Sequence, residues 1–440
     1  MTRRGMIASW LALLIIGASA AGSVSDAGGP AGVLPLKARA EVYDRWLRTR
    51  LDTVLPEIMR RDKIDMWLVI CTEYEEDPVY LSLVPASSFS ARRKTILVFT
   101  DKGKDGLERL TVSRYGIGDL YKAVWAPDKI GQFERLAEIV RERSPRRIGI
   151  DESDTFAFGD GLSASHKARL VEAIGPELAS RLVSADRLCV GWLERRTPAE
   201  LEVYPHIVGI AHGIIAEAFS RRVITPGATT AEDVEWWMRE RISGLGLQPW
   251  FHPSISIQRP KAGAPADGSV IHRGDLLHCD MGIVYLGLCT DTQEHAYVLR
   301  EGESEAPRGL RDALAAGNRL QDILLAEFRE GRSGNEILAA SLGKAKAEGL
   351  RPSIYTHPLG FHGHAAGPVI GLWDMQGGVP GTGDYPLFFD TCHSIELNVR
   401  IAVPEWNGQD VQIALEEDAA FTRAGTAFLD GRQTGLILIR

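Results

Sequence analysis

The residues with the clearest capacity for chemistry in this chain of 440 residues are two aspartates, Asp280 and Asp291, in a stretch that predicts a β-hairpin. We expect a strand that ends near Asp280, a reversal around residues 285–287, and a return strand that reaches Asp291. With a turn between residues 285 and 286, the two carboxylates lie directly opposite, with Cβ atoms roughly 5 Å apart. Two buried anions this close repel each other and need a shared proton or a cation. The hairpin therefore predicts a cation site.

Other polar residues could complete this site. His252 begins a predicted strand, and two further strands alternate polar with apolar residues so that Glu396 and Glu416 lie on their polar faces. Three of the chain's 11 histidines lie in one Gly-rich loop, namely His357, His362 and His364. Four carboxylates with one histidine suit paired Mn, Co, Zn or Fe(II) ions about 3.5–4 Å apart better than a structural zinc site, which prefers Cys and His.

Two domains are predicted to position these residues, because 440 residues exceed the usual size of one core. In residues 38–190, strand-like runs alternate with helical stretches, which indicates an α/β domain, and no cluster of histidines or carboxylates predicts chemistry there. In residues 191–440, capping sequences at Thr197, Thr230 and Ser333 begin helices that lie between the strands with polar residues. This second domain is predicted to be α+β.

The first 37 residues are predicted to lie outside the fold. Arg3 and Arg4 precede an apolar run over residues 6–18, and residues 18–20 read Ala-Ser-Ala, which is typical of a secretory signal peptide over residues 1–20. The run is shorter than the roughly 20 residues of a membrane span, so no stable membrane anchor is expected. Residues 21–37 are predicted to be a flexible leader. We expect an exported protein, periplasmic or extracellular, with an uncleaved anchor as the alternative.

Charge and cysteine content exclude other classes. A net charge of −8 argues against a nucleic-acid partner, since such proteins usually have a basic surface. The five cysteines are scattered and form no C-x-x-C sequence, so neither a disulfide framework nor a zinc ribbon is predicted. Cys279 and Cys289 are the plausible pair if one disulfide forms across the hairpin.

The order and spacing of these residues resemble the pita-bread metallopeptidases, the family of methionine aminopeptidase, Xaa-Pro aminopeptidase and prolidase, with creatinase as a metal-free relative. The family's V-D-x-G and S-D strands, eleven residues apart, are matched by residues 279–282 and 290–291. Its G-H-x-x-G loop, its T-x-E-P strand and its last Glu before an acidic pair are matched by residues 363–367, 394–397 and 416–418. The resemblance covers about residues 195–430, and residues 38–190 resemble the N-terminal domain of the creatinase, prolidase and Xaa-Pro aminopeptidase branch.

This resemblance implies a pita-bread catalytic domain with two divalent metal ions, Mn first and Zn, Co or Fe as alternatives. The implied metal ligands are Asp280, Asp291, His364, Glu396 and Glu416. Asp291 and Glu416 would bridge the ions, Glu396 would also shuttle a proton, and His252 would stabilise the tetrahedral intermediate or the leaving amine. His357 and His362 are candidates for substrate contact. The implied activity is hydrolysis of a peptide bond near the N-terminus of a peptide, of the Xaa-Pro aminopeptidase or dipeptidase type.

The residues around the predicted metal site depart from the family pattern. Gln293 stands where many members have Arg, Ala414 where proline-specific branches often have Arg, and Gly360 where they carry a histidine four residues before the metal ligand. Three alternatives stay open: a dinuclear hydrolase of a non-peptide amide or ester, a non-catalytic peptide-binding member of the fold, and a metal-independent C–N hydrolase like creatinase. The retained ligand set counts against the last two. Relatives with the extra domain are often dimers, so a homodimer is a candidate assembly.

Overall fold

The computed structural model describes residues 32–261 and 268–440. The predicted signal peptide and most of the predicted leader therefore lie outside the described residues. Residues Leu34–Arg440 form one compact unit. None of the helices in the described part of the chain combines the length and the apolar content needed to span a bilayer.

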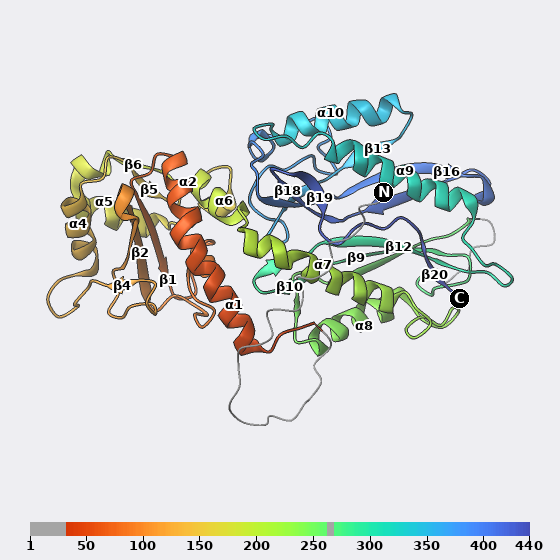
Figure 1. Ribbon diagram of the computed structural model, residues 1–440, viewed down its shortest axis with the longest axis horizontal. Coiled ribbons are helices and arrows are strands. Elements are labelled where there is room, and N and C mark those ends of the chain that lie inside the picture. Colours follow the sequence, from red (N-terminus) through yellow and green to blue (C-terminus); the bar gives the residue numbers. More distant parts are fainter. Residues whose placement is uncertain (1–31, 262–267) are drawn as a thin grey trace, which may run out of the picture. The chain divides into compact units, whose positions relative to one another are not determined.

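The N-terminal part is built on a six-stranded sheet in the order β4-β3-β2-β1-β5-β6. Its strands are β1 (Met66–Thr72), β2 (Lys94–Asp101), β3 (Leu107–Thr111), β4 (Lys122–Ala123), β5 (Ile148–Ile150) and β6 (Leu182–Ser184). Helices α1 (Leu36–Thr49), α2 (Leu55–Arg61) and α6 (Asp186–Glu194) pack on one face (Figure 1). Helices α4 (Gln132–Arg143) and α5 (Ala164–Ala179) pack on the other, and the short α3 (Tyr80–Leu83) follows β1. The predicted α/β domain is thus confirmed.

Strand β1 shows why this sheet needs helices on both sides. Trp67 and Val69 point into the core beneath α1, α2 and α6, whereas Leu68 and Ile70 point into the core beneath α4 and α5. All four are at most 1% exposed, so the run is continuously apolar where a half-exposed strand would alternate. This pattern is that of a sheet buried on both faces.

The helix predicted over residues 38–61 is interrupted by a π-helical segment, Arg50–Val54, between α1 and α2. Pro56, at the start of α2, has no backbone N–H to continue the α-helical ladder, which accounts for the wider turn before it. Arg50 begins the segment and is 1% exposed. The irregular turn therefore places a cation inside the protein.

Two carboxyl groups, Asp77 and Asp151, are also buried in the N-terminal core, at 2% and 1% exposure. Asp151 Oδ1 accepts hydrogen bonds from Trp67 Nε1 at 2.5 Å and from Cys189 Sγ at 3.2 Å. Burial raises the pKa of Asp77 to about 6, and burial together with the charge of Asp77 raises the pKa of Asp151 well above its ordinary value. The pair keeps protons at pH values where both groups ionise in the unfolded chain.

We expect Asp151→Asn to stabilise the protein at pH 8 and to flatten the pH dependence of unfolding. A carboxyl whose folded pKa is raised contributes stability below about pH 4, and this is lost as the pH rises through the folded value of about 6 for Asp77. An Asn side chain keeps an acceptor for Trp67 and can donate an N–H to Asp77 without ionising. Urea unfolding should show a gain of about 1–3 kcal/mol at pH 8 and little change at pH 4. Parallel pH curves for the variant and the wild type would contradict this explanation.

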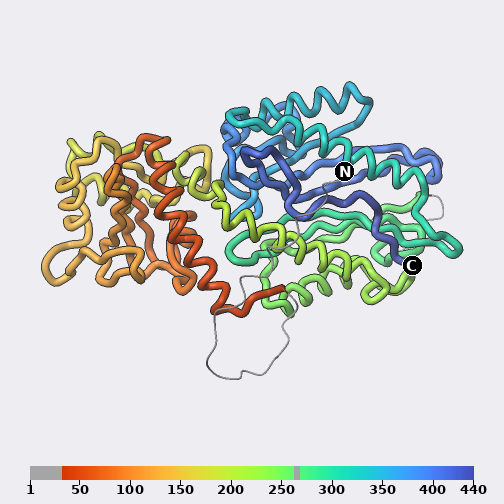
Figure 2. The backbone as a smooth tube through the Cα atoms, viewed as in Figure 1, coloured from red at the N-terminus to blue at the C-terminus, as the bar shows by residue number. Residues whose placement is uncertain are grey.

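The described residues of the C-terminal part form four sheets with the orders β20-β12-β9-β8, β13-β16-β17, β14-β15-β18-β19 and β11-β10-β7. The strands are β7 (Gln248–Pro249), β8 (Ser254–Gln258), β9 (Leu276–Met281), β10 (Ile283–Tyr285), β11 (Leu288–Cys289), β12 (Thr292–Val298), β13 (Pro352–Ile354), β14 (His357–Leu359), β15 (Thr391–Ser394), β16 (Leu397–Val403), β17 (Gln409–Leu415), β18 (Asp418–Thr422), β19 (Gly425–Phe428) and β20 (Ile437–Ile439). The last strand, β20, returns to pair in parallel with β12 (Figure 2).

Long helices accompany these sheets, namely α7 (Pro198–Ala218), α8 (Ala231–Gly244), α9 (Arg308–Leu325) and α10 (Gly334–Ala347). The predicted capping boxes at Thr197, Thr230 and Ser333 are confirmed, each with its acidic partner three residues later. Helix α8 contacts β8, and α9 contacts β16 and β17. The predicted α+β class of this part is confirmed, while the boundary at residue 190, inside α6, stays a prediction.

The hairpin at Asp280 and Asp291 forms with a register different from the predicted one. Residues 286 and 287 make a two-residue turn with φ of 55° and 77°, and Tyr285 pairs with Leu288. Positive φ at both central residues is the geometry of a tight hairpin turn, and it moves the turn one position along the chain. Asp280 is therefore opposite Gln293, and the prediction that it is opposite Asp291 is wrong. The pairing partner of Asp280 thus changes by two residues, from Asp291 to Gln293. A change of two residues keeps both aspartates on the same face of the sheet.

The two strands predicted to carry Glu396 and Glu416 are each divided at the glutamate. Residues 391–394 and 418–422 pair in one sheet as β15 and β18, whereas β16 and β17 pair in another. The register is the same on both sides of the break, since Ser394 pairs with Asp418 and Leu397 with Leu415. Glu396 and Glu416 therefore lie opposite each other at the point where two strands pass between sheets.

All five cysteines are buried and free. The hairpin register places Cys279 opposite Glu294 and Cys289 opposite Val284. The pairing of Cys279 with Cys289, which the sequence left open, is therefore not formed.

Candidate metal centre

Four carboxylates and two histidines come together where the sheets of the C-terminal part meet. Within the described residues, three overlapping groups have ligand atoms within 4.8 Å of one another: Asp280, Asp291 and Glu416; His357, Glu396 and Glu416; Asp291, His357 and His364. Asp291 and Glu416 are the carboxylates that occur in two groups each. The structure thus brings together all five predicted ligands and adds His357.

His357 lies at the centre of this cluster and is 2% exposed. Its Nε2 atom is 3.3 Å from Glu416 Oε1, 3.5 Å from Asp291 Oδ2 and 3.9 Å from Glu396 Oε2. Its Nδ1 atom is 3.0 Å from the carbonyl oxygen of Pro358, which can only accept a hydrogen bond. In the neutral imidazole Nδ1 therefore carries the proton, which leaves Nε2 directed at the carboxylates as a potential ligand.

His364, the histidine predicted as the metal ligand, lies at the edge of the cluster. Its ring is exposed and meets the ring of His357 edge-on, with centroids 4.7 Å apart. The family pattern G-H-x-x-G fits His364, which follows Gly363, whereas His357 follows Thr356 and fits only the shorter H-x-x-G. His357 belongs to strand β14 and pairs with Ser394, which carries it to the two glutamates.

Neutral side chains hold the two glutamates in place. Gln293 Nε2 donates to Glu396 Oε1 at 2.7 Å and to Glu416 Oε2 at 2.6 Å. Ser394 Oγ donates to Glu416 Oε1 at 2.6 Å. Gln293 Oε1 in turn is 2.9 Å from His278 Nε2. Gln293, which the sequence marked only as a departure from the family pattern, is thus the residue that links both glutamates.

The electrostatics of the cluster call for a cation. Burial, and next the charge of Glu416, raise the pKa of Asp280 to about 8 and the pKa of Glu396 to about 10. The same causes raise the pKa of Asp291 well above its ordinary value. Asp280 Oδ1 and Asp291 Oδ1 are buried without any hydrogen-bond partner among the described residues. Unpartnered carboxylate oxygens with an imidazole nitrogen form a donor set that fits divalent metal ions.

His252 and His362, both predicted as catalytic, belong to none of these groups. His252 precedes β8 and contacts helix α8, with Nδ1 3.1 Å from Arg239 Nη1 and Nε2 3.8 Å from Glu235 Oε2. Ser254, the first residue of β8, pairs with Asp280, and His252 lies two residues before Ser254 in the sequence. His362 instead stacks on Phe158 of the N-terminal part, with ring centroids 4.5 Å apart.

Aromatic residues surround the histidines of the cluster, with Trp250 in direct contact and Trp373 in contact through Tyr355. Trp250 donates from Nε1 to the Thr290 carbonyl at 2.8 Å, and its ring centroid is 5.2 Å from that of His364. Trp373 is 43% exposed and contacts Tyr355, whose ring lies 5.4 Å from His357. Phe251 packs on Trp250.

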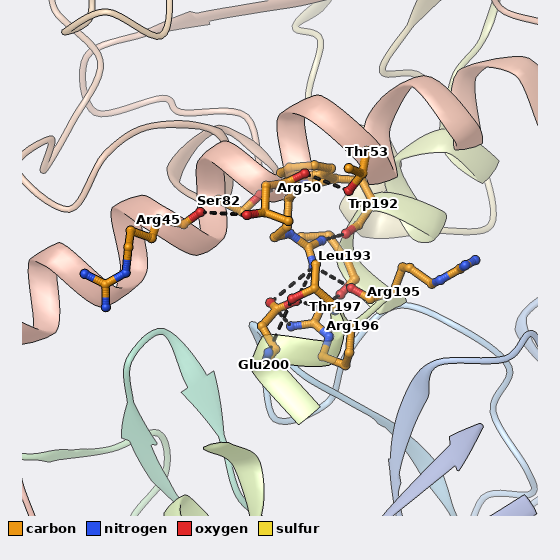
Figure 3. A network of polar contacts seen from close by, with 11 residues as sticks. Arg45, Arg50, Thr53, Ser82, Trp192, Leu193, Arg195, Arg196, Thr197 and Glu200 are labelled. Carbon is orange, nitrogen blue, oxygen red and sulfur yellow. Dashed lines mark hydrogen bonds and ion pairs between the residues drawn. The ribbon is translucent and has the colours of Figure 1, made fainter. Parts of the chain in front are cut away.

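The loop after His357 is held by a buried ion network, in which Arg50 and Arg196 share Glu200 (Figure 3). Arg50 Nη1 is 3.2 and 3.1 Å from the two Glu200 oxygens, and Arg196 Nη1 is 3.3 Å from Oε1. Phe361 lies against both cations, 5.0 Å from Arg50 and 4.8 Å from Arg196. No pattern in the sequence indicates this network, which anchors the segment between His357 and His364.

A comparison with known protein families identifies the family of the part of the chain that contains the cluster. Residues 206–422 match metallopeptidase family M24. The C-terminal part of the chain belongs to this family. All six clustered residues lie within the matched stretch of the M24 domain. Membership of a metallopeptidase family implies that divalent metal ions bind to it, and the cluster is the candidate site.

Solved structures show the same fold over nearly their whole length. An X-Pro aminopeptidase from Thermotoga maritima superimposes with a TM-score of 0.61 at 17% identity, over 87% of this chain and 99% of that one. An Xaa-Pro dipeptidase from Bacillus anthracis gives 0.56 at 18% identity, over 91% and 99%. A dipeptidase PepE from Mycobacterium ulcerans gives 0.60 at 16%, over 91% and 98%. The predicted pita-bread fold with an α/β N-terminal domain is confirmed. Among curated proteins, no match was found.

Proposed function

We propose that this M24 protein is a dinuclear-metal peptidase that cleaves a peptide bond near the N-terminus of its substrates, of the Xaa-Pro aminopeptidase or Xaa-Pro dipeptidase type. The observation that carries the proposal is the convergence of four carboxylates with His357 around unpartnered oxygens. Solved structures with the same fold include an X-Pro aminopeptidase and an Xaa-Pro dipeptidase, which supports the choice of substrate class. Mn is the first candidate metal, followed by Zn, Co and Fe, because the ligand set is mostly oxygen.

The three overlapping groups support particular ligand roles. Asp291 and Glu416 would bridge the two ions, because each occurs in two of the groups. Asp280 would complete one side, and His357 with Glu396 the other. This assignment replaces His364 by His357 as the histidine ligand, since Nε2 of His357 lies nearest to the carboxylates. His364 would then face the substrate.

Divalent ions at this site would polarise the scissile carbonyl and lower the pKa of a bound water from about 15.7 to roughly 7. Glu396 would move the proton: Gln293 holds its Oε1 at 2.7 Å, which leaves Oε2 to take a proton from the attacking water and pass it to the leaving amine. His364, beside His357, would donate a hydrogen bond to the developing charge on the substrate. His252, two residues before the start of β8, is a second candidate for this role. Trp250 and Tyr355 contact the ring of His364 and would orient it toward the substrate.

The alternative is a dinuclear hydrolase of a non-peptide amide or ester. The observation that favours it is Ala414, which pairs with Asn398 beside the cluster and provides no cation for a short peptide's carboxylate. A panel of Xaa-Pro peptides, other peptides and simple amides and esters separates the two functions.

The first 20 residues, outside the described part, support the further proposal that the protein is exported to the periplasm or beyond the cell. Protein recovered from the expected compartment should begin near residue 21. An intact N-terminus on protein found only in the cytoplasm would contradict export.

Removal of the metal tests the proposed function. We expect a purified protein with close to two equivalents of Mn, Zn, Co or Fe, and we expect a chelator to abolish peptide cleavage, which added metal then restores. Asp291→Asn should lower kcat by about 10³-fold, because a metal contributes several kcal/mol to the transition state. Asp312→Asn, which changes an aspartate of helix α9 whose side chain is 66% exposed, is the matched control and should keep full activity. Full activity in the presence of chelator, or in Asp291→Asn, would refute the dinuclear mechanism.

A further inference from the structure

A polar face runs from the metal cluster along strands β16 and β17. On β16 the residues that follow Glu396 on this face are Asn398 and Arg400, and their partners on β17 are Ala414 and Gln412. Side chains alternate along a strand, and the register is unchanged across the break at Glu396, so these residues share one face with the two glutamates. The metal cluster is thus continuous with a strip of neutral side chains, beyond which lie the cation Arg400 on β16 and the anion Asp410 on β17.

Exposure increases steadily along this strip. Glu416 is 1% exposed, and Glu396 and Asn398 are both 7% exposed. Ala414 and Gln412 are half-buried, and Arg400 is exposed. A groove with Ser353, Trp373, Asn398, Arg400 and Gln412 among its lining residues occupies this face. It therefore leads from the buried cluster to solvent.

Trp373 connects the groove to the proposed catalytic histidines. It lines the groove, and its ring is 5.7 Å from that of Tyr355. The Tyr355 ring is in turn 5.4 Å from His357 and 5.8 Å from His364. A substrate that enters along the groove would contact Trp373 and then Tyr355 before it reaches the histidines.

The outer end of the groove carries one arginine that is free to bind an anion. Arg351, which also lines the groove, is held by Asp410 at 2.7 and 2.6 Å. The guanidinium of Arg400 forms no hydrogen bond or ion pair within the described residues, and the carboxylate that lies close enough for Arg400 to help lower its pKa, Asp410, is already paired with Arg351. Lys346, another lining residue, adds to the positive charge. This end of the groove therefore attracts negatively charged groups.

The spacing determines which anion fits. Arg400 is four residues from Glu396 along the chain, which corresponds to about 13 Å at 3.3 Å per strand residue. An extended peptide covers a similar length per residue. An anion bound by Arg400 is therefore three or four residues from a peptide bond at the cluster, whereas the carboxylate of a dipeptide would fall beside Asn398 and Ala414.

We infer that this groove binds extended peptides and that Arg400 selects those with a carboxylate three or four residues beyond the cleaved bond, either a C-terminal carboxylate or an acidic side chain. The inference rests on the proposed peptidase function and narrows it to oligopeptides. Asn398 and Gln412 provide side-chain amides along the path, which can bond to the peptide backbone. Arg400 is a specificity residue in this scheme, and the cluster itself is unaffected by it.

A ladder of peptides tests the inference. Metal-loaded protein would be assayed with peptides of two to six residues that begin Ala-Pro or Ala-Ala, each made as a free acid and as a C-terminal amide. We expect the ratio of kcat/KM between acid and amide to reach roughly threefold to tenfold for peptides that place the carboxylate three or four residues beyond the cleaved bond. The preference should act mainly through KM and decrease as salt is added, because the groove end is exposed.

Variants of Arg400 make the test specific. Arg400→Gln should bring the acid-to-amide ratio close to one. Arg400→Glu should reverse the preference, so that a peptide with Lys three or four residues beyond the cleaved bond becomes better than one with Glu. Arg146→Gln, which changes an arginine of the N-terminal part that is 89% exposed, is the matched control and should keep the wild-type ratio.

The outcomes separate this inference from the proposed function. Peptide cleavage with equal rates for acids and amides, or a ratio that survives in Arg400→Gln, would overturn the role of Arg400 while the peptidase function stands. A ratio that is highest for dipeptides would also overturn it. No cleavage of any peptide in either series would refute the peptidase function and the inference together.

Discussion

His357→Ala is expected to lose bound metal and to lower kcat by about 10³-fold, whereas His364→Ala should keep the full metal content. The difference follows from position. Nε2 of His357 lies 3.3 to 3.9 Å from three carboxylates, and its Nδ1 proton is fixed by the Pro358 carbonyl. His364 is exposed at the edge of the cluster. Its loss should reduce catalysis by about 10²-fold or more, in line with other hydrogen-bond donors to a transition state.

Metal content by elemental analysis, measured beside peptide cleavage, distinguishes the two histidines. His357→Ala should contain about one equivalent of metal or less, and excess metal should restore little of its activity. His364→Ala should contain as much metal as the wild type while its kcat remains low. The reverse pattern, with metal lost only in His364→Ala, would support the assignment made from the sequence motif and overturn the one made from the structure.

The choice between these histidines marks the limit of what the sequence can predict. The G-H-x-x-G pattern selects His364, and it carries no information on which histidine lies beside the glutamates. That depends on β14 pairing with β15, a contact between residues 357 and 394. The helices, by contrast, were predictable because a capping box such as Thr197 with Glu200 acts within four residues.

The hairpin shows why an error of register left the site prediction intact. Asp280 pairs with Gln293 and not with Asp291, because the turn at residues 286 and 287 has positive φ at both positions. A displacement by two residues preserves the face of every side chain, whereas a displacement by one would have reversed it. Asp280 and Asp291 therefore still meet Glu416. The same register brings Gln293 between Glu396 and Glu416, a contact that no local pattern indicates.

Substitution of Glu200 should produce the largest loss of stability, because two buried cations depend on it. Arg50 and Arg196 are each 1% exposed, and both are paired with Glu200 (Figure 3). Burial lowers the pKa of Arg50 to about 10 in spite of this partner. Glu200→Ala would leave both guanidinium groups buried without a counter-charge, which costs about 3–5 kcal/mol. It would also remove the capping bond from the Thr197 N–H, for about 1 kcal/mol more.

Urea unfolding of Glu200→Ala beside Glu202→Ala, an exposed glutamate on the same helix, measures this loss. Glu202→Ala should change the free energy of unfolding by less than about 0.5 kcal/mol. Glu200→Gln keeps an acceptor of the same size and should fall between the two, because it removes the charge but retains hydrogen bonds. Phe361 packs on both arginines, so Glu200→Gln should also lower peptide cleavage through the loop between His357 and His364 while the metal content stays near that of the wild type. A Glu200→Ala protein as stable as Glu202→Ala would show that the arginines reach other partners or solvent, and the network would then have no role in holding the histidine loop.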